Sequence, residues 1–295
     1  MNQDTQRIEE LITTKINECT IKTIRRLGGL TNRTYYVACE KRKSIQEYVV
    51  RLPGLGTEKM IVRSDEEKST KLACKLGIDA HLYFFDSITG EKITEYISNA
   101  KTMSVEDLQH KESIILMADT LKKLHHCGEN TGVYFNVIDL AETYERVIYN
   151  DGGILYDDYN EVKAYINRLK NEYMPFVEMV PCHNDPLCEN WMLQNNGKMF
   201  LIDWAYAGMN DPIRDLADLS IEADLTCEME KFFLQSYFGR MPVEKEWNAL
   251  KINKILIDYL WSLWGISRVI YEGEVMKKYA DNRWQRMKKN MKKVQ

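Results

Sequence analysis

The sequence predicts an α+β protein of two lobes, a small lobe containing a sheet and a larger helical lobe. Apolar residues alternate in short segments over residues 21–97, and they recur at helical spacing over most of the remainder. One irregular stretch, residues 181–210, interrupts the helical part. Separate runs of strands and helices are typical of two lobes with a cleft between them. We therefore expect a boundary near residue 97, with lobes at 1–97 and 98–295.

The first elements read as one amphipathic helix followed by a sheet. Ile8, Leu11, Ile12 and Ile16 recur at helical spacing within residues 4–18. Strand-like segments follow, and they indicate an antiparallel meander. These segments are Ile21 to Leu27, Thr34 to Cys39 and Ile45 to Leu52.

The next elements complete the sheet-containing lobe. A helix is predicted from Ser64 to Leu76, with Ser64 as the N-cap, Glu67 completing a capping box and Gly77 as the stop. Two further strands are expected around a turn at Ser87 to Gly90. They are His81 to Phe85 and Lys92 to Ile97.

The larger lobe reads as a series of helices around one short strand, Lys198 to Ile202. An apolar stripe from Ile114 to His125 predicts a helix that Gly128 ends. The other predicted helices are Leu140 to Tyr149, Tyr159 to Tyr173, Ile213 to Asp224, Cys227 to Phe238, Glu244 to Tyr271 and Val275 to Lys293.

The composition excludes some classes of protein. The chain carries 44 acidic and 40 basic residues, a formal charge of −4, which argues against a nucleic-acid binder. It has no apolar run long enough to span a bilayer and no secretory signal, so we expect a cytoplasmic protein without membrane insertion. The aromatic set of 17 Tyr, 6 Trp and 8 Phe is rich in rings with a polar tip, which suit pocket walls. The oligomeric state stays open.

The strongest local motif places His183, Asp185 and Asn190 in one loop, and Asp203 follows a hydrophobic strand soon after. Phosphoryl transfer requires this set of residue types. One carboxylate accepts the proton of the attacking hydroxyl, while the amide and the second carboxylate hold Mg²⁺ against the ATP phosphates. The motif therefore predicts phosphoryl transfer with ATP and Mg²⁺ as cofactors.

The pattern His-x-Asp-x4-Asn followed by Ile-Asp-Trp resembles the aminoglycoside phosphotransferase and choline kinase superfamily. The loop Gly28 to Asn32 and the helix segment Trp261 to Trp264 make the chain most similar to bacterial choline kinases of the phosphocholine-incorporation type. The resemblance implies a protein-kinase-like fold and transfer of the ATP γ-phosphate to choline. It also implies that Asp185 is the catalytic base, that His183 orients the loop and that Asp215 braces it. In the same way it assigns Asn190 and Asp203 to magnesium.

The resemblance also assigns an ATP site in the first lobe. It implies that Arg51 contacts the α- and β-phosphates and that Glu66 anchors Arg51, with Glu67 as the alternative anchor. An ordinary edge-strand charge is the other interpretation of Arg51. The remaining residues expected at ATP lie in the glycine loop and at the junction of the lobes, where main-chain groups meet adenine. They are Gly28, Gly29, Thr31, Asn32, Glu95, Tyr96 and Ile97.

The substrate site implied by the resemblance is an aromatic cage. A quaternary ammonium has no N–H donor, so aromatic faces and nearby carboxylates must recognise it. Trp261 and Trp264 are three residues apart and share a helix face, which by itself also fits core packing. By resemblance these two form cage walls with Tyr206 and Tyr279, and Glu222 is the acidic residue for the cation.

Four positions remain to be interpreted. Ala205 stands where the family normally has Glu, and Leu187 stands where eukaryotic members have Gln. Loss of the Glu at 205 removes a carboxylate beside Mg²⁺ and the cation, and we expect Ala205→Glu to raise activity. Asp211 and Asp218 are interpreted as a helix cap and a carboxylate at the pocket rim.

Several functions stay open beside choline phosphorylation. Ethanolamine and thiamine are alternative acceptors, and ethanolamine is hard to exclude because its ammonium also fits against Trp. An aminoglycoside is disfavoured, since its several ammonium groups call for an acidic rim. A hypothesis of another class is a catalytically impaired choline-binding protein, suggested by Ala205.

Overall fold

The computed structural model describes residues 3–28, 32–54 and 61–294 of the chain. It divides into two compact units that are each discontinuous in sequence. The first unit contains residues 1–104 and 188–207, and the second contains residues 105–187 and 208–295. A single boundary at residue 97 does not account for residues 188–207, which belong to the first unit although they follow residues of the second. That one lobe binds the nucleotide and the other the substrate stays a prediction.

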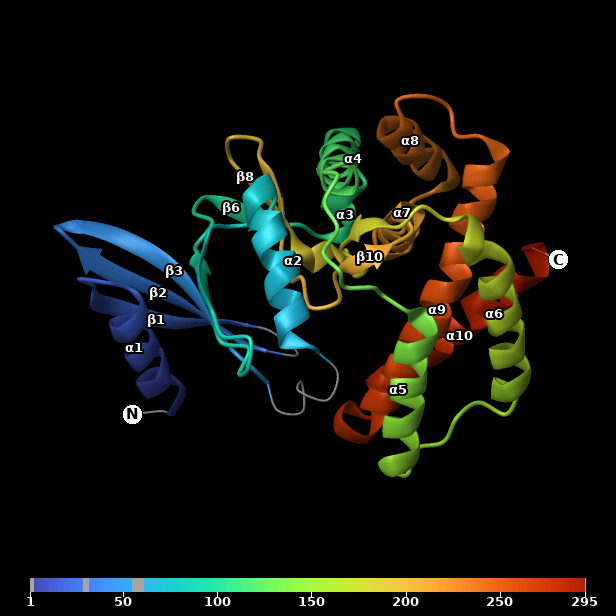
Figure 1. The fold of residues 1–295 in the computed structure, drawn as a ribbon, viewed down its shortest axis with the longest axis horizontal. Helices are drawn as coiled ribbons and strands as arrows, with labels where there is room; N and C mark the ends of the chain where they lie inside the picture. Colours follow the sequence, from blue (N-terminus) through green and yellow to red (C-terminus); the bar gives the residue numbers. More distant parts are fainter. Residues whose placement is uncertain (1–2, 29–31, 55–60, 295) are drawn as a thin grey trace. The chain divides into compact units, whose positions relative to one another are not determined.

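The first unit is built on a five-stranded sheet with the order β1-β2-β3-β5-β4, and every pairing in it is antiparallel (Figure 1). Apolar side chains of α1 pack on this sheet, among them Ile8, Leu11 and Ile12, beside Val37 and Val50. The predicted meander is therefore confirmed. The strands are β1 (Thr20–Gly28), β2 (Arg33–Lys41), β3 (Ser44–Leu52), β4 (Leu82–Phe85) and β5 (Lys92–Glu95), and the helices are α1 (Gln3–Lys15) and α2 (Arg63–Leu76).

Helix α2 ends as predicted but begins differently. Gly77 closes it with φ 67°, a left-handed conformation that glycine adopts without strain. The prediction of Ser64 as N-cap is wrong, because the cap is Val62, whose side chain makes no capping hydrogen bond. Arg63 consequently lies in the first turn, where its guanidinium binds Glu66 instead of facing solvent.

A second sheet of the first unit has the order β6-β8-β9, formed by β6 (Ala100–Thr102), β8 (Trp191–Gln194) and β9 (Met199–Leu201). The sequence predicts one strand in residues 181–210, whereas the structure has four, β7 to β10. Each is three or four residues long, too short to show a period of two.

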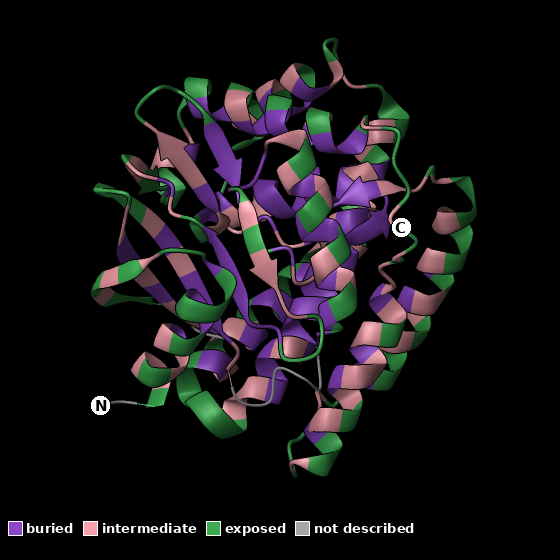
Figure 2. Cartoon of the chain, turned by 60° about the vertical axis from the view of Figure 1, so that its left-hand side comes forward, coloured by how far each residue is buried: buried purple, intermediate pink, exposed green. Residues whose placement is uncertain are grey.

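The second unit is mainly helical, as predicted. Its two-stranded sheet pairs β7 (Val180–Cys182) with β10 (Gly208–Asn210), and α9 and α10 lie side by side (Figure 1). Exposed residues lie on the outer helices (Figure 2), whereas residues 255–263 of α9 and 213–220 of α7 are all buried. No helix in the described ranges is long and apolar enough to cross a membrane. The helices are α3 (Val105–Leu108), α4 (Lys111–His125), α5 (Val137–Asn150), α6 (Tyr159–Tyr173), α7 (Pro212–Glu222), α8 (Cys227–Phe238), α9 (Glu244–Glu272) and α10 (Glu274–Val294), with a short 3₁₀ turn at Met174–Phe176. A second 3₁₀ turn, Cys188–Asn190, belongs to the first unit.

Candidate active site

The loop that carries Asp185 follows β7 in the second unit, and hydrogen bonds to the Asp215 carboxylate of α7 hold its backbone. The Asp215 carboxylate accepts hydrogen bonds from the backbone N–H groups of His183 and Asn184, each at 2.7 Å. Asn184 has φ 67°, and its side chain donates to the Gly208 carbonyl at 3.3 Å. These bonds fix the backbone immediately before Asp185, which is partly exposed. Sequence reasoning missed Asn184, although an Asn before Asp-Pro is a signal for a left-handed turn residue.

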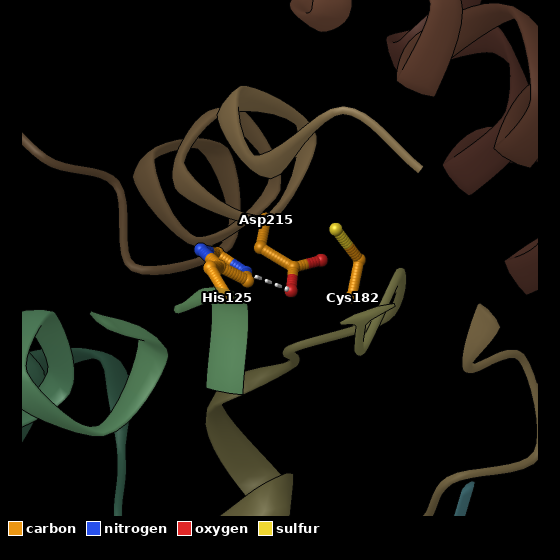
Figure 3. Close-up of side chains that lie close together, drawn as sticks. All are labelled: His125, Cys182 and Asp215. Atoms are coloured by element: carbon orange, nitrogen blue, oxygen red, sulfur yellow. Dashed lines mark hydrogen bonds and ion pairs between the residues drawn. The ribbon is translucent and has the colours of Figure 1, made fainter. Parts of the chain in front are cut away.

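His125 reaches the same carboxylate from the end of α4 (Figure 3). Its Nε2 lies 3.0 Å from Asp215 Oδ2, and its Nδ1 lies 2.8 Å from the Tyr237 hydroxyl. Burial raises the pKa of Asp215, but hydrogen bonding and the charge of His125, together with His183, bring the pKa below its ordinary value. Cys182 lies nearby and bonds the Asn210 carbonyl. Because His125 and Asp215 bond each other and Cys182 Sγ bonds the Asn210 carbonyl, we interpret the cluster as a buttress for the loop.

Asn190 and Asp203 lie at the same end of a hairpin in the first unit. Trp191 pairs with Leu201, and the Ile202 N–H donates to the Asn190 carbonyl at 2.9 Å. Asp203 is exposed and has φ 68°, a conformation that Asp tolerates better than most residues. An amide oxygen and a carboxylate are hard donors, so the pair fits a Mg²⁺ ion.

Glu66 is the centre of a buried charge cluster in the first unit. Arg51 of β3 forms an ion pair with it, and Arg63 Nη1 donates to its second oxygen at 2.7 Å. Lys92 Nζ lies 3.8 Å away. Burial raises the pKa of Glu66, but the charges of Arg51 and Lys92 and the bonds from both arginines lower it to about 2. Glu66 therefore lies where the predicted anchor of Arg51 is needed, whereas Glu67 pairs with Lys71.

The cluster contains three cations, whereas the carboxylates that face them are Glu66 and, for Lys92, also Asp79. Arg51 also donates to the Gly90 carbonyl, at 2.8 Å from Nη2, which fixes the plane of its guanidinium. Arg63 and Lys92 were not predicted, because the sequence spacing gives no reason to bring β5 and the first turn of α2 to one point. An excess of cations beside β3 is suited to bind phosphates.

The predicted glycine loop is described only at its ends. Gly28 has φ 140°, which other residues rarely adopt, and no atom of the described residues lies within 4 Å of an added Cβ. Asn32 Oδ1 accepts from Arg63 Nη2 and from the Gly54 N–H, each at 3.4 Å. Gly29 and Thr31 lie outside the described residues.

Of the three residues predicted to meet adenine, Glu95 ends β5, and Tyr96 and Ile97 follow it. The Glu95 N–H donates to the His81 carbonyl at 2.8 Å, and the Tyr96 N–H donates to the Glu47 carbonyl at 3.1 Å. Since these two donors serve the sheet, an adenine contact through a main-chain N–H has to use Ile97.

Three aromatic rings of the predicted cage come together in the second unit. Trp261 and Trp264 of α9 have ring centroids 6.2 Å apart, and Trp264 and Tyr279 of α10 are 5.7 Å apart, both edge to face. Gly265 permits this approach, since an added Cβ would lie 2.9 Å from Tyr279 Cδ1. Trp264 and Tyr279 stay partly exposed, whereas Trp261 is buried. Tyr206 belongs to the first unit and is partly buried there.

Glu222, the predicted acidic residue for the cation, forms an ion pair with Arg283 of α10. The Arg283 guanidinium also lies 4.6 Å from the Tyr279 ring centroid and 3.5 Å from Asp258. Sequence reasoning used the Tyr-Ala-x-x-Arg segment for Tyr279 alone and missed Arg283, which joins the ring to Glu222.

The two other acidic residues of α7 have different outcomes. Asp211 caps the helix by accepting from the Ile213 N–H at 2.9 Å, as predicted. Asp218 was expected at a pocket rim, but its side chain is 0% exposed, so the rim position is wrong. Its place on the inner face of α7, between Asp215 and Glu222, explains the burial.

The second unit also contains a cavity of about 190 Å³ bounded by α5, α6, α7 and α9. Lys170 and Arg214 line it together with apolar residues such as Met174 and Met179. Its lining includes none of the predicted site residues, and its two cationic residues make it unsuitable for a cationic substrate.

Comparison with known proteins agrees with this geometry. The family model for choline/ethanolamine kinase matches residues 23–236. Protein LicA of Haemophilus influenzae is 27% identical over 250 residues, which are 81% of this chain and 71% of that protein. The crystal structure of the choline kinase LicA from Streptococcus pneumoniae is 32% identical, covers 99% of this chain and 100% of that chain, and superposes with a TM-score of 0.84.

A structure of LicA in complex with AMP is 29% identical, covers 100% of both chains and has a TM-score of 0.81. These similarities confirm the predicted protein-kinase-like fold and the predicted superfamily. The kinases of this family use ATP, with Mg²⁺ as the usual metal. The chain therefore belongs to the choline/ethanolamine kinase family and is a phosphotransferase that acts on an alcohol group.

Proposed function

We propose that the chain phosphorylates choline with ATP, giving phosphocholine and ADP, and that it does so in the cytoplasm. The observation that carries this proposal is the ring cluster of Trp261, Trp264 and Tyr279 beside the Glu222–Arg283 pair. Aromatic faces and a carboxylate are what a cation without N–H donors requires. The related LicA structure is a choline kinase by its description, which favours the same acceptor.

In this proposal Asp185 accepts the proton of the choline hydroxyl as its oxygen attacks the γ-phosphate in line. His183 and Asp215 hold the backbone before Asp185 through the 2.7 Å bonds to the Asp215 carboxylate. Proton removal depends on this fixed geometry, because a small displacement of the base from the hydroxyl slows transfer strongly.

The residues that we assign to ATP, the phosphate donor, lie in the first unit. Arg51, held by Glu66, contacts the α- and β-phosphates, and Asn32 and Ile97 help to place the nucleotide. Asn190 and Asp203 would hold Mg²⁺, which when bound neutralises charge on the phosphates. Each of these assignments rests on residue chemistry and on the family match.

Side-by-side assays with choline, ethanolamine, thiamine and an aminoglycoside test the proposal, with ADP release and phosphorylated product both measured. We expect choline to have the highest kcat/KM and Asp185→Ala to abolish turnover while choline binding persists. Full activity of Asp185→Ala would refute the role of the base. Choline binding without phosphorylation by the unmodified chain would instead favour the catalytically impaired protein suggested by Ala205.

A further inference from the structure

Asp218 is a buried carboxylate that the proposed mechanism does not use. Its side chain is 0% exposed, and in the described part of the chain neither of its oxygens has a hydrogen-bond partner. A buried, unsatisfied carboxylate is costly to a fold, and buried polar groups are nearly always bonded. A polar partner absent from the free chain, such as a substrate, would relieve this cost.

The position of Asp218 on α7 connects it with both parts of the acceptor site. Residues 215, 218 and 222 follow the helical spacing of three and four, so they share one face. Asp215, one turn before, binds the backbone of the loop that carries Asp185, and Glu222, one turn after, pairs with Arg283. Asp218 therefore lies between the groups assigned to the reacting hydroxyl and those assigned to the ammonium end.

Electrostatics links Asp218 to the aromatic cage as well. Burial is the main cause of the raised pKa of the Tyr279 phenol, Arg283 lowers that pKa, and the carboxylates of Glu222, Asp185 and Asp218 raise it further. The Tyr279 phenol thus interacts electrostatically with the carboxylates of Glu222, Asp185 and Asp218. Glu222 forms an ion pair with Arg283, whereas Asp218 has no ion pair or hydrogen bond in the described residues.

We propose that Asp218 is a specificity-determining residue of the acceptor site that accepts hydrogen bonds from amino alcohols whose ammonium group carries N–H donors. This inference rests on the proposed function, since it assigns a second acceptor class to the same site. A quaternary ammonium offers no N–H to Asp218 and gains only from its charge. A primary ammonium offers three donors and loses more hydration on entering the aromatic cage, so it depends on an acceptor there.

Balancing the charge of the buried Arg214 is an alternative role for the Asp218 carboxylate. Arg214 precedes Asp218 by one turn of α7, is buried, and has Nε and Nη2 without hydrogen bonds in the described residues. Its guanidinium lies over the Phe135 ring, 4.6 Å from the centroid. If Asp218 serves only to balance this charge, removing the carboxylate affects stability and leaves substrate preference unchanged.

The test compares kcat/KM for choline, N,N-dimethylethanolamine, N-methylethanolamine and ethanolamine between the unmodified chain and Asp218→Asn. We expect Asp218→Asn to lower the value for ethanolamine by at least about tenfold and that for choline by about threefold or less. The loss should increase with the number of N–H donors. The matched control is Ser220→Ala on the same helix, because Ser220 is buried but bonds Glu230 at 2.5 Å.

Binding without ATP separates this inference from the proposed function. Tryptophan fluorescence titrated with choline and with ethanolamine reports the cage directly. If the unmodified chain binds these cations but phosphorylates none of them, the proposed function fails while the Asp218 comparison still stands. An Asp218→Asn variant whose choline-to-ethanolamine affinity ratio stays within about twofold of the unmodified chain overturns the inference. A lower Tm with that unchanged ratio assigns Asp218 to balancing Arg214.

The pH dependence gives a further readout. The pKa of Asp218 is raised to about 8: burial is the main cause, Glu222 and Asp215 also raise it, and Arg214 and Arg283 lower it. With Tyr279, these groups of α7 and α10 interact electrostatically with Asp218. Ethanolamine affinity should therefore increase between about pH 6.5 and about pH 8.5 as the carboxylate ionises. Loss of this increase in Asp218→Asn supports the inference, and an identical pH profile in both proteins contradicts it.

Discussion

The carboxylate of Asp215 accepts a 2.7 Å hydrogen bond from the backbone N–H of Asn184, the residue immediately before Asp185. A charged acceptor on a helix thus determines where the proposed base stands. The same carboxylate is bonded to His125, so loop, α7 and α4 share one buried network. A buried network of this kind is sensitive to the loss of any single member.

Asp215→Asn should lower kcat by about 100-fold with little change in choline affinity, because the amide can accept one backbone N–H but repels the other. It should also remove a pH effect on stability. The pKa of Asp215 lies below its unfolded value, so its stabilisation is present above that value and lost as the pH falls through the folded pKa. Acid unfolding curves and kcat measure both effects. Normal kcat in a folded Asp215→Asn variant would contradict the bracing role.

Glu66→Gln should weaken ATP binding and destabilise the first unit, because Arg51, Arg63 and Lys92 would lose their shared carboxylate. Breaking a buried ion pair costs about 3–5 kcal/mol. Glu66 has a pKa of about 2 against 4.5 when unfolded, so its contribution is full above 4.5 and is lost as the pH falls toward 2. The control is Glu67→Gln, whose exposed partner is Lys71. Equal ATP KM values for the two variants would refute the prediction that Glu66 anchors Arg51 for ATP binding.

Gly265→Ala should raise the KM for choline and leave the KM for ATP unchanged. The added Cβ would lie 2.9 Å from both Tyr279 Cδ1 and Ala280 Cβ, so α10 or the ring must move. Overpacking costs about 1–3 kcal/mol, which exceeds the gain in helix propensity of about 1 kcal/mol. Lys251→Ala on the exposed side of α9 is the control. A choline KM like that of the control would show that the spacing of α9 and α10 does not set the cage.

Ala205→Glu should raise kcat/KM for choline by about tenfold, since it restores a carboxylate where the family usually has one. Residue 205 is partly buried in the turn after β9, two residues from Asp203. Ala205→Gln has a similar size without the charge and serves as the control. An unchanged or lower kcat/KM in Ala205→Glu would count against the hypothesis.

The sequence by itself determined the helices, the meander and the phosphotransferase motif. Helices α6 and α8 begin and end where the apolar period predicts, because long amphipathic segments carry their own signal. The residues of the His-x-Asp-x4-Asn loop could be identified from the sequence because phosphoryl transfer requires carboxylate and amide side chains at close spacing. Glu66 was likewise identified as the anchor of Arg51, because its position in the sequence matches the spacing found in the family.

Only the tertiary structure decided which distant charges meet. Lys92 and Arg63 join Glu66 through the pairing of β3 with β5 and the first turn of α2, and Arg283 joins Glu222 through the packing of α10. The sequence alone could not show that Asp218 is buried with no hydrogen bond from the described part of the chain, because the free energy of a buried carboxylate depends on donors that other elements supply. Local periodicity reports which side of a helix is apolar, whereas the partners of a buried charge are set by contacts between elements far apart in the chain.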